Sequence, residues 1–90
     1  MEGTAAHKVS DGKLVEVRVT YDEAFENVTI RGDFFLEPPT ALEELEAAIE
    51  GLPTDSDRAR IVGAIQGVEA QLIGFDAEAL ATALEEAVHR

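Results

Sequence analysis

Cysteine is absent from this 90-residue chain. The protein can therefore form neither a disulfide nor a thiolate metal site, and its composition does not support secretion. No apolar run approaches the ~20 residues of a membrane-spanning helix, and the polar start, MEGTAAHK, does not have the form of a signal peptide. We therefore expect a soluble, cytoplasmic protein.

Basic residues are scarce as well. Seven lysines and arginines face nineteen aspartates and glutamates, which gives a net charge of −12, and Lys8 and Lys13 are the only lysines. A surface this acidic is repelled by nucleic acid and by anionic membranes, so we expect neither as a partner. High salt screens the self-repulsion of such a chain. The charge and the scarcity of lysine favour a halophilic source, and the alternative is a mesophilic acidic protein with a basic partner.

The length suits one domain over residues 1–90, which would bury roughly 60–65 % of its unfolded surface. Residues 1–4 are expected to be loose, and residues 10–12 to form a hairpin turn. Three strands are expected, at Ala5–Val9, Lys13–Tyr21 and Asn27–Arg31. Along the middle strand apolar residues alternate with polar ones, which predicts one buried face. That face consists of Val15, Val17, Val19 and Tyr21.

Helices are expected over most of the remaining chain. Thr40 and Glu43 form a capping-box pattern that predicts the start of the first helix, and Gly51 predicts its end. A second helix is expected from 54–57 to about Gly67, because apolar residues recur there at helical spacing, and Asp55-Ser56-Asp57 is interpreted as its N-capping segment and not as a calcium-binding loop.

The third helix has the clearest start signal. Asp76 is its expected N-cap, and Phe75 before it is expected to pack on Leu80, whereas residues 68–75 are ambiguous. The predicted fold class is therefore α+β with two layers, an antiparallel three-stranded sheet packed against three helices.

The stretch Val28–Pro39, VTIRGDFFLEPP, joins the strands to the helices. Gly32 interrupts the strand pattern, and a glycine there marks a bend or a close approach of backbones. Either Gly32 only turns the chain while the following rings fill the core, or the corner with Asp33 also touches a partner or ligand. Neighbouring side chains alternate along an extended backbone, so Phe34 and Phe35 cannot both point into the core. One ring is then left for the surface as an interface anchor.

No motif for catalysis or metal binding is present. His7 and His89, the only histidines, lie near the two ends, and no HExxH, P-loop, GxGxxG or GxSxG pattern occurs. The glutamates of residues 43–50 are interpreted as a solvated helix face. Because no nucleophile, base and oxyanion hole come together, we expect no catalytic residue, no metal site and no enzymatic activity from this chain alone.

Three segments together carry a family resemblance: HKVSDGKLVEVRV, VTIRGDFFLEPPTALEELEAAIEGLP and LIGFDAEALATALEEA. Their shared features are Gly12-Lys13-Leu14, Gly32-Asp33-Phe34-Phe35, Pro38, a helix from Leu42 to Pro53 and a segment from Leu72 to Leu84. In this order the chain resembles the small C-terminal domain of lipoate–protein ligases. It is similar in particular to the free-standing form, the accessory subunit of a two-part ligase. Ser10-Asp11 departs from the proline and glycine usual at that turn.

The resemblance implies a non-catalytic accessory subunit that associates with a lipoate–protein ligase catalytic subunit. It implies that this subunit is required for activating lipoate to lipoyl-AMP, and that it meets lipoyl acceptor domains through the complex. ATP and lipoate, with the catalytic lysine, belong to the large subunit, so this chain alone is expected to bind no cofactor.

We assign partner or ligand binding to five residues: Lys13, Gly32, Asp33, Phe34 and Phe35. Lys13 could face the phosphates of ATP or lipoyl-AMP, pair with a partner carboxylate, or simply be solvated. Asp33 could cap the turn after Gly32 or form a bond across an interface. Two other classes stay open: a stand-alone acidic interaction module, such as a homodimer pairing sheet edges, and a small-ligand carrier using the sheet–helix interface.

The acidity generates the first prediction, that stability depends on salt. Self-repulsion acts further when the Debye length grows from about 3 Å at 1 M salt to about 30 Å at 0.01 M. Circular dichroism melts across that range should show a midpoint that rises with salt. A midpoint independent of salt would remove the halophilic interpretation.

Overall fold

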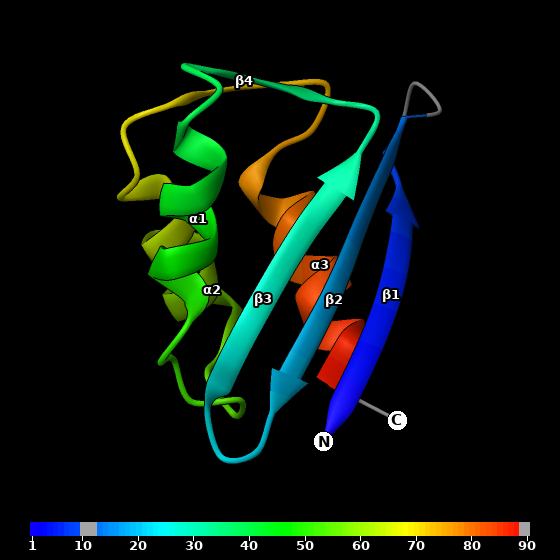
Figure 1. The fold of residues 1–90 in the computed structure, drawn as a ribbon, viewed down its shortest axis with the longest axis vertical. Coiled ribbons are helices and arrows are strands. Elements are labelled where there is room, and N and C mark those ends of the chain that lie inside the picture. The colour runs from blue at the N-terminus through cyan, green and yellow to red at the C-terminus, as the bar shows by residue number, and fades with distance from the viewer. Residues whose placement is uncertain (10–12, 89–90) are drawn as a thin grey trace.

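The computed structural model describes residues 1–9 and 13–88 and has the predicted α+β architecture. Strands β1 (Glu2–Lys8), β2 (Leu14–Tyr21) and β3 (Phe25–Gly32) form an antiparallel sheet in the order β1-β2-β3. Helices α1 (Ala41–Ile49) and α3 (Ala77–Val88) pack on one side of this sheet, and α2 (Arg58–Gln66) packs against these two helices (Figure 1). The predicted turn at residues 10–12 lies outside the described residues.

The buried face of β2 is the one that its alternation predicts. Val15, Val17 and Val19 are fully buried, and helix α3 packs beneath β1 and β2. The buried side of α3 consists largely of alanines together with Leu80 and Leu84. Such small side chains let the helix approach the sheet closely.

The expectation that residues 1–4 are loose is wrong, because β1 begins at Glu2. The amino group of Met1 donates to the carbonyl oxygen of Tyr21 over 2.7 Å, and the Tyr21 amide donates to the Met1 oxygen over 2.8 Å. The first residues are therefore held along the end of β2. Strand β3 also begins earlier than predicted, at Phe25.

Two of the three predicted N-caps are confirmed. Asp57 accepts a hydrogen bond from the Arg60 amide at 2.9 Å, and Asp76 accepts one from the Ala79 amide at 2.8 Å. The capping box at Thr40 is wrong, because its side chain makes no capping bond. The amides of residues 41 and 42 instead donate to the carbonyl oxygens of residues 38 and 39.

A single arginine joins helices α2 and α3. Nη1 of Arg58 lies 3.2 Å from Oε1 of Glu78, and Nη2 lies 2.8 Å from Oε1 of Glu85. Nη2 also donates to the hydroxyl of Thr82 over 3.0 Å. Exposed ion pairs contribute little to stability, so this cluster mainly orients the two helices.

The outer edge of β3 is occupied along its length. The Val28 amide donates to Oε2 of Glu50 over 3.1 Å, and the Ile30 amide donates to Oε2 of Glu46 over 3.0 Å. At the start of the strand, Phe25 exchanges backbone hydrogen bonds with the loop after α1. An edge strand left open would be a template for pairing with another chain. The expectation that the glutamates of residues 43–50 form only a solvated face is therefore wrong for these two.

The edge contacts generate the second prediction. Replacing Glu46 and Glu50 together by alanine should lower the free energy of unfolding by about 2 kcal/mol, since two amides lose their acceptors. The double glutamine variant is the matched control, because it removes the same charge but keeps an acceptor oxygen at each position. Urea melts measure both. Equal stability of the two double variants would show that the edge bonds contribute nothing.

Candidate functional site

The corner at the end of β3 depends on a close approach of two backbones. Gly32 has a φ of +152°, and a Cβ added there would lie 2.0 Å from the carbonyl oxygen of Leu14. The Asp33 amide donates to that same oxygen over 2.9 Å. Only glycine therefore fits at this position, and the predicted bend is confirmed.

The two adjacent rings point in different directions, as the alternation requires. Phe34 is half-buried and packs on Phe75, with ring centroids 4.4 Å apart and an interplanar angle of 41°. Phe35 is 70 % exposed. The prediction that one ring would stay at the surface is confirmed, and that ring is Phe35.

Phe35 belongs to a short two-stranded ribbon that the sequence did not reveal. Strand β4 (Phe35–Glu37) pairs antiparallel with β5 (Gln71–Ile73). Leu36 pairs with Leu72 on the inner side, whereas Phe35 pairs with Ile73, which is 39 % exposed, on the outer side. We call Phe35 and Ile73 the ribbon patch. Three-residue strands are too short to show a period of two, which is why residues 68–75 were ambiguous.

The side chain of Lys13 lies at this corner, next to Gly74. A Cβ added at Gly74 would lie 3.1 Å from Cδ of Lys13 and 3.4 Å from the carbonyl oxygen of Asp33. The aliphatic part of the Lys13 side chain therefore lies over Gly74, the residue after β5, close to the end of β3. The fold thus brings all five assigned residues to one corner of the molecule, at the end of the sheet where β4 crosses (Figure 1).

The charged groups at the corner have no partners within the described residues. The side chains of Lys13 and Asp33 make no hydrogen bond or ion pair there. No contact therefore supports the interpretation of Asp33 as a cap of its own turn. Both groups are available to a partner.

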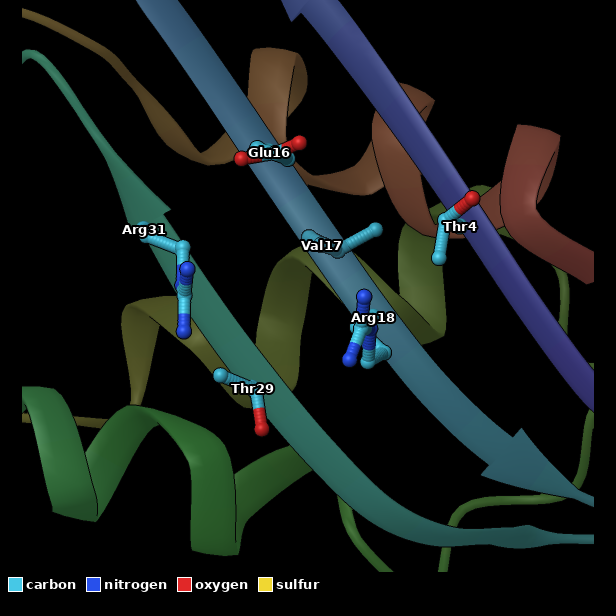
Figure 2. Close-up of a pocket in the computed structure, with 6 residues that line it drawn as sticks. All are labelled: Thr4, Glu16, Val17, Arg18, Thr29 and Arg31. Carbon is cyan, nitrogen blue, oxygen red and sulfur yellow. The ribbon is translucent and has the colours of Figure 1, made fainter.

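A second polar feature lies on the side of the sheet away from the helices. A hollow of about 140 Å³ there is lined by Thr4, Glu16, Val17, Arg18, Thr29 and Arg31. Figure 2 shows Arg18 on β2 and Arg31 on β3, on the same side of the sheet as Thr29 and Thr4. Alternation along β2 places Arg18 on the wet face, but only the register of β3 shows that Arg31 lies near it.

Among the described residues, no group of three or more histidines, aspartates or glutamates could hold a metal ion. No helix in the same part of the chain is long and apolar enough to cross a membrane.

The fold has a counterpart among solved structures. The chain is similar to a chain from the structure of an archaeal lipoylation system, a bipartite lipoate protein ligase and its E2 lipoyl domain from Thermoplasma acidophilum. The likeness has a TM-score of 0.76 and 21 % sequence identity, and covers 93 % of this chain and 94 % of the other. No protein-family model matches the sequence, and no curated protein matches it. At this identity the likeness shows a shared fold.

The close approach at Gly32 generates the third prediction. Gly32→Ala should lower the free energy of unfolding by about 3 kcal/mol, since the added methyl meets a backbone oxygen and the φ is strained. Gly63→Ala is the matched control, because a Cβ in the middle of α2 meets nothing within 4 Å. It should leave the protein equally stable or more stable by up to about 1 kcal/mol. Chemical denaturation measures both, and equal effects would contradict the close approach.

Proposed function

We propose that this chain is a non-catalytic accessory subunit of a lipoate–protein ligase. It associates with the catalytic subunit and is required there for the activation of lipoate to lipoyl-AMP. The observation that carries this proposal is the fold shared, over nearly the full length of both chains, with a component of a bipartite ligase system. The sequence resemblance at the Gly12-Lys13-Leu14 and Gly32–Phe35 motifs supports it independently.

In this proposal the corner docks on the catalytic subunit. Phe35 and Ile73 offer an apolar anchor, and aromatic residues, phenylalanine among them, are enriched at protein interfaces. Around it stand one ammonium group, Lys13, and one carboxylate, Asp33, neither paired within the described chain. An apolar centre with unpaired charges at its rim is the usual composition of a specific interface.

In this proposal the catalytic subunit binds ATP and lipoate and provides the catalytic groups. This chain stabilises the active conformation of that subunit. Binding energy gained at the corner would hold the ligase in the conformation competent for adenylation, as closing subunits and lids do in other enzymes. Lys13 has two roles open to it within the complex: its ammonium group could face a phosphate of ATP or lipoyl-AMP, or pair with a carboxylate of the ligase. Lipoyl acceptor domains would meet this chain through the complex, in a cytoplasm that we propose is rich in salt.

The alternative of a stand-alone homodimer pairing its sheet edges is less well supported. The β3 edge already donates hydrogen bonds to Glu46 and Glu50 and exchanges them with the loop after α1. Among the described residues, β1 is the edge of the three-stranded sheet that stays open. Two copies, each with a charge of −12, would also repel each other.

The fourth prediction is that this chain stimulates lipoate activation without catalysing it. Pyrophosphate leaves when lipoate is adenylated, so its release measures the step. The chain alone should release none, and adding it to the catalytic subunit should raise the rate at least tenfold. Equal rates from the catalytic subunit with and without this chain would refute the proposal.

Single substitutions locate the docking surface in the same assay. Lys13→Ala, Asp33→Asn and Phe35→Ser should each raise the concentration needed for half-maximal stimulation at least fivefold. Each should leave the free energy of unfolding within about 0.5 kcal/mol, as surface changes usually do. Arg60→Ala and Asp55→Asn are matched controls, because they make the same charge changes at exposed positions. Full stimulation by all three corner variants would show that the docking surface lies elsewhere on the molecule.

A further inference from the structure

The outer face of the sheet, the side away from the helices, has a charge unlike the rest of the molecule. Alternation along the strands places Lys8, Arg18 and Arg31 on it, with Glu2 and Glu16, and Glu26 is exposed at the bulge of β3. The charges of this face therefore balance, on a chain whose net charge is −12. Around the hollow two arginines stand against one glutamate, and this local excess of positive charge gives the site its own electrostatic preference.

The two central arginines form no ion pair with any residue that the structure describes. Within the described part of the chain, the ion pairs are those of Arg58, and neither Arg18 nor Arg31 forms one. Glu16 stands opposite Arg31 in register, but the two side chains do not form an ion pair. Both guanidinium groups therefore remain available at the surface.

The register arranges these groups in rows across the sheet. Arg18 lies between Thr4 on β1 and Thr29 on β3, and Arg31 lies two residues further along β3 (Figure 2). Diagonal neighbours of this kind have their side chains about 7–8 Å apart. Successive same-face residues of a helix, at i and i+4, are separated by about 5–6 Å between Cβ atoms. Two flexible arginines can therefore meet two carboxylates presented on one face of a helix.

The chemistry of the hollow favours carboxylates over other anions. A guanidinium group matches a carboxylate with two parallel hydrogen bonds, and the hydroxyls of Thr4 and Thr29 add donors. The hollow holds about 140 Å³, less than the ~300 Å³ at which small-molecule pockets begin. None of its lining residues is aromatic, so it lacks the stacking surface that single-stranded nucleic acid uses.

We propose that the outer face of the sheet docks an acidic protein surface, with Arg18 and Arg31 each receiving a partner carboxylate. We choose this occupant because of charge complementarity. The rest of the acidic surface repels an acidic partner, so such a partner can approach at the part of the outer face around Arg18 and Arg31, which we call the arginine face. The occupant we propose is an acidic surface on another protein and not a second copy of this chain, whose whole charge of −12 would add to that of the first copy. The proposal does not rest on the ligase assignment, and it would stand if pyrophosphate release were not stimulated.

A synthetic helical peptide tests the proposal. The probe is an alanine-based helix carrying glutamates at i, i+4 and i+8, and the control peptide carries the same number of glutamates spread around the helix. Amide and guanidinium signals of the intact 90-residue chain are followed by NMR at about 50 mM salt. We expect the probe to shift the signals of Thr4, Arg18, Thr29 and Arg31, and to bind at least fivefold more tightly than the control peptide.

Matched variants decide which residues are responsible. Arg18→Gln and Arg31→Gln should each weaken probe binding at least fivefold, whereas Arg60→Gln, which removes the same charge from exposed α2, should change it less than twofold. An equal loss with Arg60→Gln, or no localised shifts, would overturn the proposal. The proposal would also be overturned if an oligothymidylate of the same charge bound more tightly than the glutamate peptide. Self-association that Arg18→Gln abolishes, seen by light scattering, would assign the face to a second copy instead and would also overturn it.

Discussion

The alternation of side chains along β2 is the constraint on which the rest of the molecule depends. Val15, Val17 and Val19 are completely buried, and each contributes about 1.5–3 kcal/mol by leaving water. A register shift of one residue would expose all three and bury Glu16 and Arg18. The same register pairs Val15 with Gly32, so it also brings the end of β3 against Leu14. The core, the arginine face and the corner are thus consequences of one pairing.

Acidic residues in this chain serve the fold as well as its solubility. Glu46 and Glu50 accept hydrogen bonds from the edge of β3, Asp57 and Asp76 cap helices, and Arg58 lies between two glutamates. In each case a carboxylate accepts hydrogen bonds from backbone amides or from a guanidinium group. A negative charge strengthens such hydrogen bonds. Much of the remaining acidity repels itself. The acidity of such a surface is therefore partly a structural requirement and partly a cost that salt reduces.

Local chemistry explains which parts of this architecture could be predicted from the sequence. Patterns among residues that are close in the sequence were sufficient to predict β2, the caps at Asp57 and Asp76, and the placing of one ring of Phe34 and Phe35 at the surface. The β4–β5 ribbon could not be predicted, because each strand has three residues and its partner lies more than thirty residues away. The capping box predicted at Thr40 was wrong for a related reason. The residues match the capping-box pattern, but the carbonyl oxygens of the two prolines before Thr40 accept hydrogen bonds from the first amides of the helix.

The corner and the arginine face meet at the end of β3, where Arg31 directly precedes Gly32. Their interactions respond differently to salt. Burial of the ribbon patch is not weakened by salt, since exclusion of salts such as sulfate from apolar surface strengthens it. Attraction between exposed guanidinium and carboxylate groups is screened within about 8 Å at 0.15 M ionic strength, and within about 3 Å at 1 M. In a salt-rich solution a partner at the ribbon patch would therefore keep its affinity, whereas a partner at the arginines would be attracted only at contact, where the charges select its orientation.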